Sequence, residues 1–217
     1  MHSCFCTSYF ENREAWERRY LRWLDHHAKV FPGTPLLMID DGSPFTPEDP
    51  GIAITTDLSE MSIGERATIS RFPNRLGRSA MLDYPGWFRS FTYSVEIAKR
   101  FNFKKIVHVE SDAFILTRKA SNYINAVTSG WTALWYPEES FAETCIQIIC
   151  QDRFASLNRL RVAPYRTQYA GKLIELYLPL THIERGLQGS RYSGGVPKGA
   201  DFAVLLEDGT TFTSDFD

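Results

Sequence analysis

The stretch that most constrains this chain runs from Lys105 to Phe114 and reads KIVHVESDAF. Its first half is apolar and rich in β-branched residues, which predicts a buried strand. Two carboxylates, Glu110 and Asp112, follow at the end of this strand with one residue between them. On a strand, that spacing directs both side chains to the same side. Because two like charges at a buried strand end repel each other, we expect a divalent cation between them, and oxygen ligands favour Mg²⁺ or Mn²⁺.

Strand and helix patterns alternate along the chain before this stretch. Residues 2–9 and 35–39 predict strands, and apolar residues at helical spacing after Asn12 predict a helix between them. Pro85 opens a second amphipathic helix that leads into the 105–114 strand. This order predicts an α/β fold with a mainly parallel, twisted sheet flanked by helices. Ligands of such sheets lie just beyond the carboxyl ends of the strands, so we expect a phosphate-bearing substrate there.

The other segments give weaker patterns. Residues 51–56 predict a short strand and residues 62–70 a short helix, within a region that otherwise has the composition of loops. Residues 130–136 predict another strand. Ser140 and Glu143 have the spacing of a capping box, which predicts a helix over the residues that follow.

Composition and charge exclude several classes of protein. The 217 residues suit one domain, and a net charge of −2 argues against a nucleic-acid partner. No apolar run approaches the ~20 residues needed to span a bilayer, and no N-terminal signal pattern is present. The four cysteines lack the spacing of a zinc site, so we expect buried free thiols in a reducing compartment. We therefore expect a cytoplasmic protein, for which peripheral association with a membrane remains open.

A second cluster of polar residues follows the first two predicted strands. The motif Asp40-Asp41-Gly42-Ser43 ends the second strand beside Thr7-Ser8-Tyr9, where the first strand ends. Asp, Gly and Ser favour turns, so this motif is either a turn or part of a site. In a site, the Asp40 carboxylate would accept a nucleobase N–H and Tyr9 would stack on the base.

Taken together, these elements resemble the GT-A-type nucleotide-sugar glycosyltransferases over roughly residues 1–160. The resemblance consists of a strand ending in Thr-x-Tyr, a helix, a strand ending in Asp-Asp-Gly-Ser, and a helix leading into a strand that ends in an acidic pair. The pair here is Glu-x-Asp, where the family usually has Asp-x-Asp. The resemblance implies a GT-A-like, Rossmann-like single domain over residues 1–217. Residues 1–116 would form its nucleotide-binding half, and residues 117–217 its acceptor-binding half with a flexible C-terminal segment.

The resemblance also implies an activity and its partners. The activity is a metal-dependent, hexosyltransferase-type reaction with Mn²⁺ or Mg²⁺ as cofactor. The sugar would pass from a nucleotide-diphosphate donor, a UDP-sugar, to a hydroxyl group of a glycan or glycolipid acceptor. The implied donor-binding residues are Thr7, Ser8, Tyr9, Asp40, Arg89, Glu110, Ser111, Arg191 and Lys198. The implied metal ligands are Glu110, Asp112 and His182.

Three of these assignments have a structural alternative. The acceptor hydroxyl needs a general base, for which Glu143 and then Glu139 are candidates, but Glu143 also fits the capping box. His182 is either a metal ligand or a surface histidine. The glycine-rich segment from Arg185 to Lys198 is either a solvated loop or a lid whose cations neutralise the leaving diphosphate, with Arg191 among them.

Two other functions remain open. A sugar-nucleotide nucleotidyltransferase normally has a loop rich in Gly and Lys or Arg directly after the first strand, where this chain has Phe10-Glu11-Asn12-Arg13. A non-catalytic nucleotide-sugar-binding module would share the binding residues without turnover. Calorimetry with a nucleotide and a screen for donor hydrolysis separate these functions from glycosyl transfer.

Overall fold

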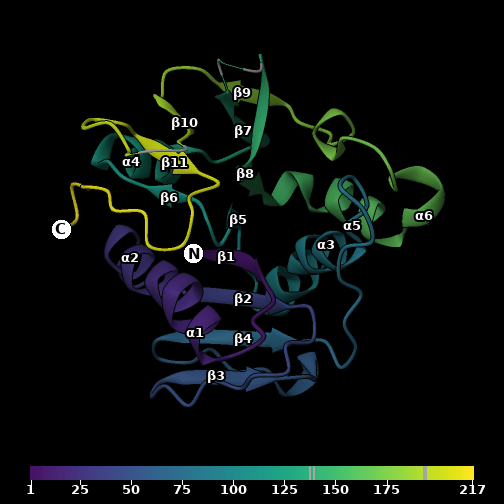
Figure 1. Ribbon diagram of the computed structural model, residues 1–217. Coiled ribbons are helices and arrows are strands. Elements are labelled where there is room, and N and C mark those ends of the chain that lie inside the picture. Colours follow the sequence, from purple (N-terminus) through teal and green to yellow (C-terminus); the bar gives the residue numbers. More distant parts are fainter. Residues whose placement is uncertain (137, 139, 193–194) are drawn as a thin grey trace.

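The computed structural model describes residues 1–136, 138, 140–192 and 195–217, and its core is one large twisted sheet (Figure 1). The strand order of this sheet is β3-β4-β2-β1-β5-β8-β7-β9, and its pairs are parallel except where β8 meets β5 and β7. The predicted α/β fold with a mainly parallel sheet is confirmed. The strands are β1 (His2–Ser8), β2 (Leu36–Asp40), β3 (Ile52–Thr55), β4 (Ala67–Arg71), β5 (Lys105–Val109), β7 (Trp131–Tyr136), β8 (Phe141–Cys150) and β9 (His182–Glu184).

Helices cover both faces of this sheet (Figure 1). On one face, α1 (Arg13–Ala15), a π-helical stretch (Trp16–Leu21) and α2 (Arg22–Val30) follow one another directly. On the other face lie α3 (Pro85–Arg100) and α5 (Phe154–Val162). Side chains alternate between the two resulting cores, as strand geometry requires: Cys4 and Cys6 pack with α2, whereas Phe5 packs with α3. The central strands are therefore buried on both faces and read as continuous apolar runs.

A smaller sheet and several short helices complete the fold. The small sheet has the order β10-β11-β6, and it lies beside α4 (Figure 1). These elements are β6 (Phe114–Ile115), α4 (Arg118–Ala126), α6 (Tyr165–Gln168), β10 (Gly189–Arg191) and β11 (Phe202–Val204). Three 3₁₀ turns lie at Leu58–Glu60, Gln151–Arg153 and Ile174–Leu176.

Two predicted helices are wrong, and both segments are strands. The segment predicted as a helix over 62–70 forms β4, which pairs with β2 and β3. The helix predicted after Ser140 is instead β8 as far as Cys150, which lies between β5 and β7, and only the end of the predicted segment, from Phe154, lies in a helix, α5. The spacing of the apolar residues in each segment suits either structure, and neighbouring strands on each side supply the backbone hydrogen bonds that decide the outcome. Glu143 is therefore a strand residue and not part of a capping box.

Candidate functional site

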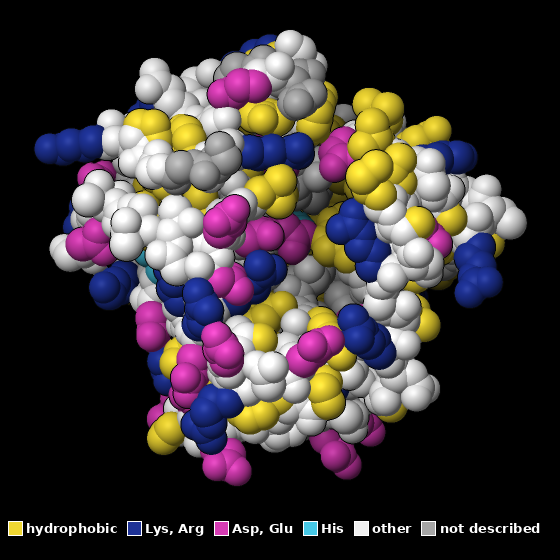
Figure 2. Space-filling model, in the orientation of Figure 1, with side chains coloured by type: hydrophobic (Ala, Val, Ile, Leu, Met, Phe, Trp, Pro, Cys, Tyr) yellow, Lys and Arg dark blue, Asp and Glu magenta, His cyan; other side chains and the backbone are white. Residues whose placement is uncertain are grey.

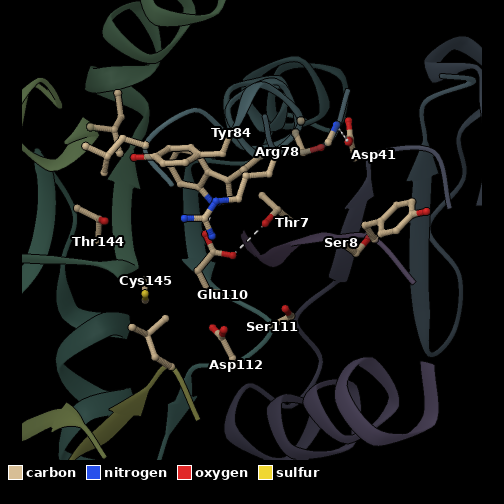
Figure 3. A pocket seen from close by; sticks show the side chains of 18 of the residues that line it. Thr7, Ser8, Asp41, Arg78, Tyr84, Glu110, Ser111, Asp112, Thr144 and Cys145 are labelled. Carbon is tan, nitrogen blue, oxygen red and sulfur yellow. Dashed lines mark hydrogen bonds between the residues drawn. The ribbon is translucent and has the colours of Figure 1, made fainter. Parts of the chain in front are cut away.

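A pocket of about 670 Å³ opens beyond the carboxyl ends of β1, β2 and β5 (Figures 2 and 3). In the sheet, β1 lies between β2 and β5, so the chain order reverses at this position. Such a reversal point is where open α/β sheets leave a crevice for ligands. The start of α3 and the middle of β8 close the pocket on its other sides. Six polar residues on the strand-end wall are Thr7, Ser8, Tyr9, Glu110, Ser111 and Asp112.

The acidic pair lines this pocket, although it does not lie on a strand as the sequence predicted. β5 ends at Val109, and residues 110–113 form a tight turn in which Ala113 N donates to Glu110 O at 2.9 Å. The turn, rather than strand alternation, brings Glu110 and Asp112 to the pocket. In Figure 3 both carboxylates lie on the pocket wall with Ser111 between them.

Glu110 is held by protein donors on both of its oxygens. Thr7 Oγ1 donates to Oε2 at 2.9 Å, Trp87 Nε1 donates to Oε1, and His108 Nε2 lies 3.1 Å from Oε1. Burial alone would raise the pKa of Glu110, but attraction to His108 and the hydrogen bonds from His108, Trp87 and Thr7 outweigh it and lower the pKa below its ordinary value. The Glu110 carboxylate is therefore ionised at neutral pH and fixed in position.

Asp112 has the opposite environment. Burial, followed by repulsion from Glu110, raises the pKa of Asp112 to about 6, and the distant Arg19 offsets this only in part. Arg19 Nη1 lies 3.9 Å from the Asp112 carboxylate, while its Nε donates to Asp208 at 2.9 Å. Two carboxylates with little positive charge between them are the arrangement in which a bound cation lowers the electrostatic energy.

The oxygens present fit a hard divalent cation that a substrate helps to hold. Asp112 is 22 % exposed and its oxygens face the pocket, while Glu110 Oε2 accepts one hydrogen bond from the described residues, which leaves it a second lone pair. Among the described residues, no three His, Cys, Asp or Glu side chains are grouped closely enough to hold a metal by themselves. Mg²⁺ commonly binds one or two carboxylates together with substrate phosphates and water.

His182, predicted as a third ligand, is not brought to this pair. It begins β9 at the edge of the sheet, three strands from β5, which is roughly 14 Å at about 4.8 Å per strand. Its side chain is 57 % exposed, and its Nε2 lies 3.5 Å from Glu184. His182 is therefore a surface histidine, as the alternative interpretation of the sequence had it.

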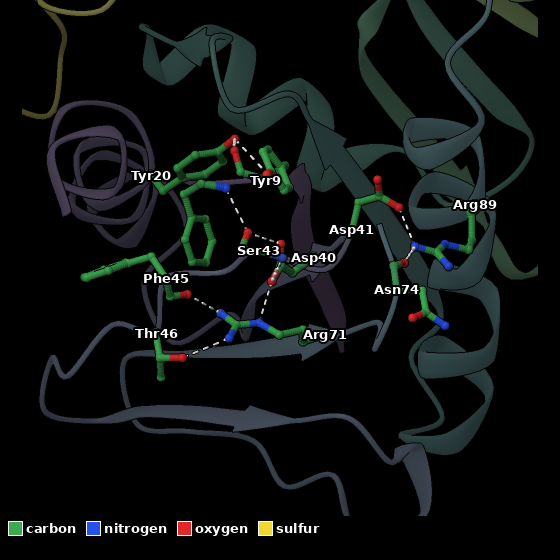
Figure 4. Close-up of polar contacts among 11 residues, drawn as sticks. Tyr9, Tyr20, Asp40, Asp41, Ser43, Phe45, Thr46, Arg71, Asn74 and Arg89 are labelled. Atoms are coloured by element: carbon green, nitrogen blue, oxygen red, sulfur yellow. Dashed lines mark hydrogen bonds and ion pairs between the residues drawn. The ribbon is translucent and has the colours of Figure 1, made fainter. Parts of the chain in front are cut away.

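The prediction placed Asp40 in the site, but the structure places Asp41 there (Figure 4). Asp40 is fully buried, and its carboxylate accepts from Ser43 Oγ at 2.5 Å and from Arg71 Nε at 2.6 Å. Burial raises the pKa of Asp40 more than the Ser43 and Arg71 contacts lower it. Its acceptors are used inside the protein, so Asp40 stabilises the end of β2 and does not reach a ligand.

Asp41 fastens the wall of the pocket to helix α3. Its Oδ2 accepts from Gly77 N at 2.8 Å and from Leu76 N at 3.2 Å, and its Oδ1 accepts from Arg89. A Cβ on Gly86 would lie 2.1 Å from Asp41 Oδ2, so only glycine fits at this contact. Arg89, predicted to bind the donor, is thus a partner of Asp41 and does not line the pocket.

Tyr9 lines the pocket with one ring face already covered. The Arg75 guanidinium lies 3.6 Å from the Tyr9 ring centroid, and Arg75 Nη1 donates to Tyr9 Oη at 2.8 Å. Tyr20 fixes the backbone beneath it by donating to Tyr9 O at 2.9 Å. A planar ligand group can therefore stack on the other face of Tyr9, or on Arg75 itself.

The wall formed by β8 carries the predicted general base in an ion pair. Glu143 is 1 % exposed; its Oε2 accepts from Arg191 Nε at 3.0 Å and its Oε1 from Cys145 N at 3.0 Å. Arg191 lines the pocket, whereas Lys198 is exposed and lies outside the pocket lining. The second candidate base, Glu139, lies outside the described residues.

Several lining residues were missed by the sequence reasoning. Arg78 lines the pocket, and among the described residues its N–H groups donate only to backbone oxygens, those of Ala80 at 3.0 Å and of Met81. Ser90 was also missed, whereas Ser8 was predicted; both are buried, and their hydroxyls have no hydrogen-bond partner among the described residues. Ser90 lies one turn after Trp87 on α3, and this shared face was the available signal. The pocket thus offers one uncommitted cation and two unused hydroxyls.

Comparisons with known proteins add one finding about the architecture. No family model matches the sequence, and no curated protein matches it. Among solved structures, the chain is similar to that of a glycosyltransferase involved in the glycosylation of the major capsid of PBCV-1, with 12% sequence identity and a TM-score of 0.49. The similarity covers 97% of this chain and 94% of that chain. Function must therefore be inferred from the chemistry of the pocket.

Proposed function

We propose that this chain is a metal-dependent glycosyltransferase that moves a hexosyl group from a UDP-sugar to a hydroxyl acceptor on a glycan or glycolipid. The observation that carries the proposal is the pocket itself, in which the Glu110–Asp112 pair, the uncommitted Arg78 and the exposed face of Tyr9 meet at the reversal point of the sheet. A nucleoside diphosphate has matching parts: a planar base, hydroxyl groups and two negative phosphates. Its sugar would extend toward β8.

The nucleoside end fits the part of the pocket formed by the ends of β1 and β2. Tyr9 offers a ring face for the base. The unpaired hydroxyls of Ser8 and Ser90 can donate to or accept from the polar edge of the base or the ribose. Leaving these hydroxyls buried without partners costs free energy, and a bound nucleoside removes that cost.

A divalent cation fits the diphosphate end. Asp112 would bind the cation directly. Glu110 Oε2, through its second lone pair, would either bind the cation as well or accept a hydrogen bond from the ribose. Such a cation neutralises charge on the departing diphosphate. Thr7, Trp87 and His108 keep Glu110 ionised and immobile for this role.

The acceptor side contains Glu143 and Arg191. Both oxygens of Glu143 are occupied, by Arg191 Nε and Cys145 N, so Glu143 can serve as a general base only if Arg191 turns away from it. The diphosphate is an anion toward which Arg191 can turn, because both side chains line the same pocket. In this scheme donor binding frees the base, which couples the two halves of the reaction.

The raised pKa of Asp112 predicts how cation binding depends on pH. The protonated carboxyl must lose its proton before it binds a metal, so affinity for Mn²⁺ should fall as pH drops through about 6. Below that pH the expected loss is about tenfold per pH unit, and above it the affinity should be nearly constant. Titration of Mn²⁺ by calorimetry between pH 5 and pH 8, in the presence of uridine diphosphate, measures this. A pH-independent affinity would contradict the role of Asp112.

Arg78 should contribute to binding through the phosphates. Arg78→Gln is expected to weaken binding of uridine diphosphate by about tenfold to a hundredfold, while binding of uridine changes little. Arg159→Gln is the matched control, because Arg159 lies on α5 and donates to Ser156. Equal losses for the nucleoside and the diphosphate would show that Arg78 does not contact phosphate.

Calorimetry with uridine diphosphate, with and without Mn²⁺, followed by a screen of nucleotide sugars for hydrolysis, tests the proposal. Metal-dependent binding and slow hydrolysis of one donor support it. Binding without turnover of any donor would favour the non-catalytic module. The nucleotidyltransferase alternative has less support, because the residue directly after the Thr7-Ser8-Tyr9 wall is Phe10, which is fully buried among Trp16 and Tyr20 rather than part of a basic loop.

A further inference from the structure

One side of the pocket mouth carries four exposed apolar side chains, which we call the apolar rim: Met81, Leu173, Leu176 and Tyr177. Their exposed fractions are 76%, 47%, 70% and 46%. Met81 and Leu173 also line the pocket, so rim and pocket are continuous. Figure 2 shows apolar side chains gathered beside the central hollow on the side of α6. Large apolar side chains this exposed and this close together mark an interaction surface.

Hydrogen bonds join the loop that carries Met81 to the segment that leads to Leu173, Leu176 and Tyr177. Gly171 N donates to Leu82 O at 2.9 Å, and Tyr84 N donates to Tyr165 Oη at 2.9 Å. Between the exposed residues, Ile174 is buried in the core that α3 and α5 share. The rim is therefore anchored from below while its apolar side chains face outward.

Positive charge borders the rim. Lys172 Nζ lies 5.0 Å from the Tyr177 ring centroid and donates to Gln168 O. Arg166 is exposed on α6, the helix that leads into the rim. Within the described residues, neither of these two cations has an ion pair with a carboxylate. The unpaired charges can therefore meet anions outside the protein.

The acidic side chains of the same segments are engaged elsewhere. Glu175 lines the pocket, and its Oε1 accepts from Thr144 Oγ1 at 3.4 Å. Asp83 interacts with the hydroxyl of Tyr165. The outer surface of the rim thus combines exposed apolar side chains with Lys172 and Arg166, while Glu175 faces the pocket.

We propose that the apolar rim docks this protein on a membrane surface that carries anionic lipid headgroups. Aliphatic side chains bordered by Lys and Arg suit the boundary between headgroups and acyl chains, and a tyrosine is favoured at that level. Among the described residues no helix has the length and apolar character to cross a membrane.

Docking in this way determines which acceptors can reach the pocket. Because Met81 and Leu173 belong to both rim and pocket, insertion of the rim brings the pocket mouth to the level of the headgroups. An acceptor hydroxyl on a lipid-linked molecule is presented at that level. This part of the inference, the lipid-linked acceptor, rests on the proposed glycosyl transfer, whereas the docking surface does not.

Flotation with lipid vesicles tests the docking surface. The full chain should bind vesicles of phosphatidylcholine with phosphatidylglycerol, bind vesicles of phosphatidylcholine alone weakly, and lose most binding in about 1 M salt, where the Debye length is about 3 Å. The double variant Leu176→Glu, Tyr177→Glu should lose at least about thirtyfold in vesicle affinity. Neither residue lines the pocket, so hydrolysis of a soluble donor should be unchanged and would show that the variant is folded.

Ile63→Glu is the matched control. Ile63 is 38% exposed and lines a second cavity of about 500 Å³, which lies near the start of β2 and so at the other end of the strands from the pocket. This variant should bind vesicles like the unsubstituted chain. Equal binding by the double variant and the control would overturn the proposal, as would a chain that binds no vesicle but forms a dimer through the rim. Vesicle binding without transfer to any lipid-linked acceptor would overturn the acceptor assignment and leave the docking surface in place.

Discussion

Replacing Asp112 by asparagine should abolish metal-dependent turnover of the donor. The amide keeps the shape of the side chain but cannot supply the charge that a divalent cation needs, so we expect kcat for donor hydrolysis to fall by about a thousandfold or more. A screen of nucleotide sugars with Mn²⁺ identifies the donor, and hydrolysis rates of the two proteins then measure the effect. Similar rates in both proteins would refute the assignment of Asp112.

The same substitution should not destabilise the metal-free protein. The pKa of Asp112 is raised to about 6, above its value in the unfolded chain, so the ionised group costs stability at neutral pH and this cost disappears below about pH 4. Asp112→Asn should therefore raise the free energy of unfolding at pH 7 by about 1 kcal/mol and change it little at pH 4. Asp208→Asn is the matched control, because Asp208 is the other partner of Arg19 and lies outside the pocket lining.

Removing the Glu110 carboxylate should have the largest effect on folding among the site residues. Glu110→Ala leaves the donors of Thr7, Trp87 and His108 without their shared acceptor in a buried region. We expect a loss of about 3 kcal/mol in the free energy of unfolding, or roughly 6–12 °C in Tm. Urea and thermal denaturation measure it, with unchanged m-values showing that the two-state transition is kept.

Two further variants separate the charge of Glu110 from its hydrogen bonds. Glu110→Gln keeps one oxygen acceptor and removes the charge, so it should cost about 1 kcal/mol in stability while donor turnover is still lost. Glu96→Ala is a control on α3, where Glu96 is 27 % exposed and meets Lys99 and Arg161 at 3.2 Å. An exposed pair of this kind contributes less than about 1 kcal/mol. If Glu110→Ala is no more destabilising than this control, the buried network does not hold the pocket wall.

The parts of the fold that could be predicted are those with a single dominant pattern. The helix after Asn12 and the helix opened by Pro85 combine a start signal with apolar spacing, and the structure contains both. Strands β4 and β8 lie where the sequence predicts helices, because the spacing of their apolar residues fits the period of a strand and that of a helix. Their state depends on strands that flank them in space but not in sequence, which a local pattern does not show.

Some parts of the candidate site could also be predicted from the sequence, and others could not. Strand ends adjacent in a parallel sheet meet at one edge, so the meeting of Thr7–Tyr9 with the acidic turn followed from the order of elements. The order of elements does not show whether Asp40 or Asp41 faces the pocket. That depends on which residue is the last of the strand, and strand bounds predicted from sequence are uncertain by about two residues. Arg78 and Ser90 come from a loop and a helix whose positions depend on packing around Asp41.

The two walls of the pocket are shaped by different features of the sheet, one by an irregularity in β8 and the other by regular strand pairing. Between Ala133 and Leu134 of β7, the register of β8 passes from Gln147 to Glu143, so three β8 residues have no partner on β7 and form a bulge. Thr144 and Cys145 in this bulge line the pocket beside Glu143, whereas the opposite wall is set by regular parallel pairing. Insertions or deletions within the bulge would reshape one wall while the strand register that aligns the other stays intact. For the proposed glycosyl transfer, the acceptor side of the pocket could therefore change while the donor side stays the same.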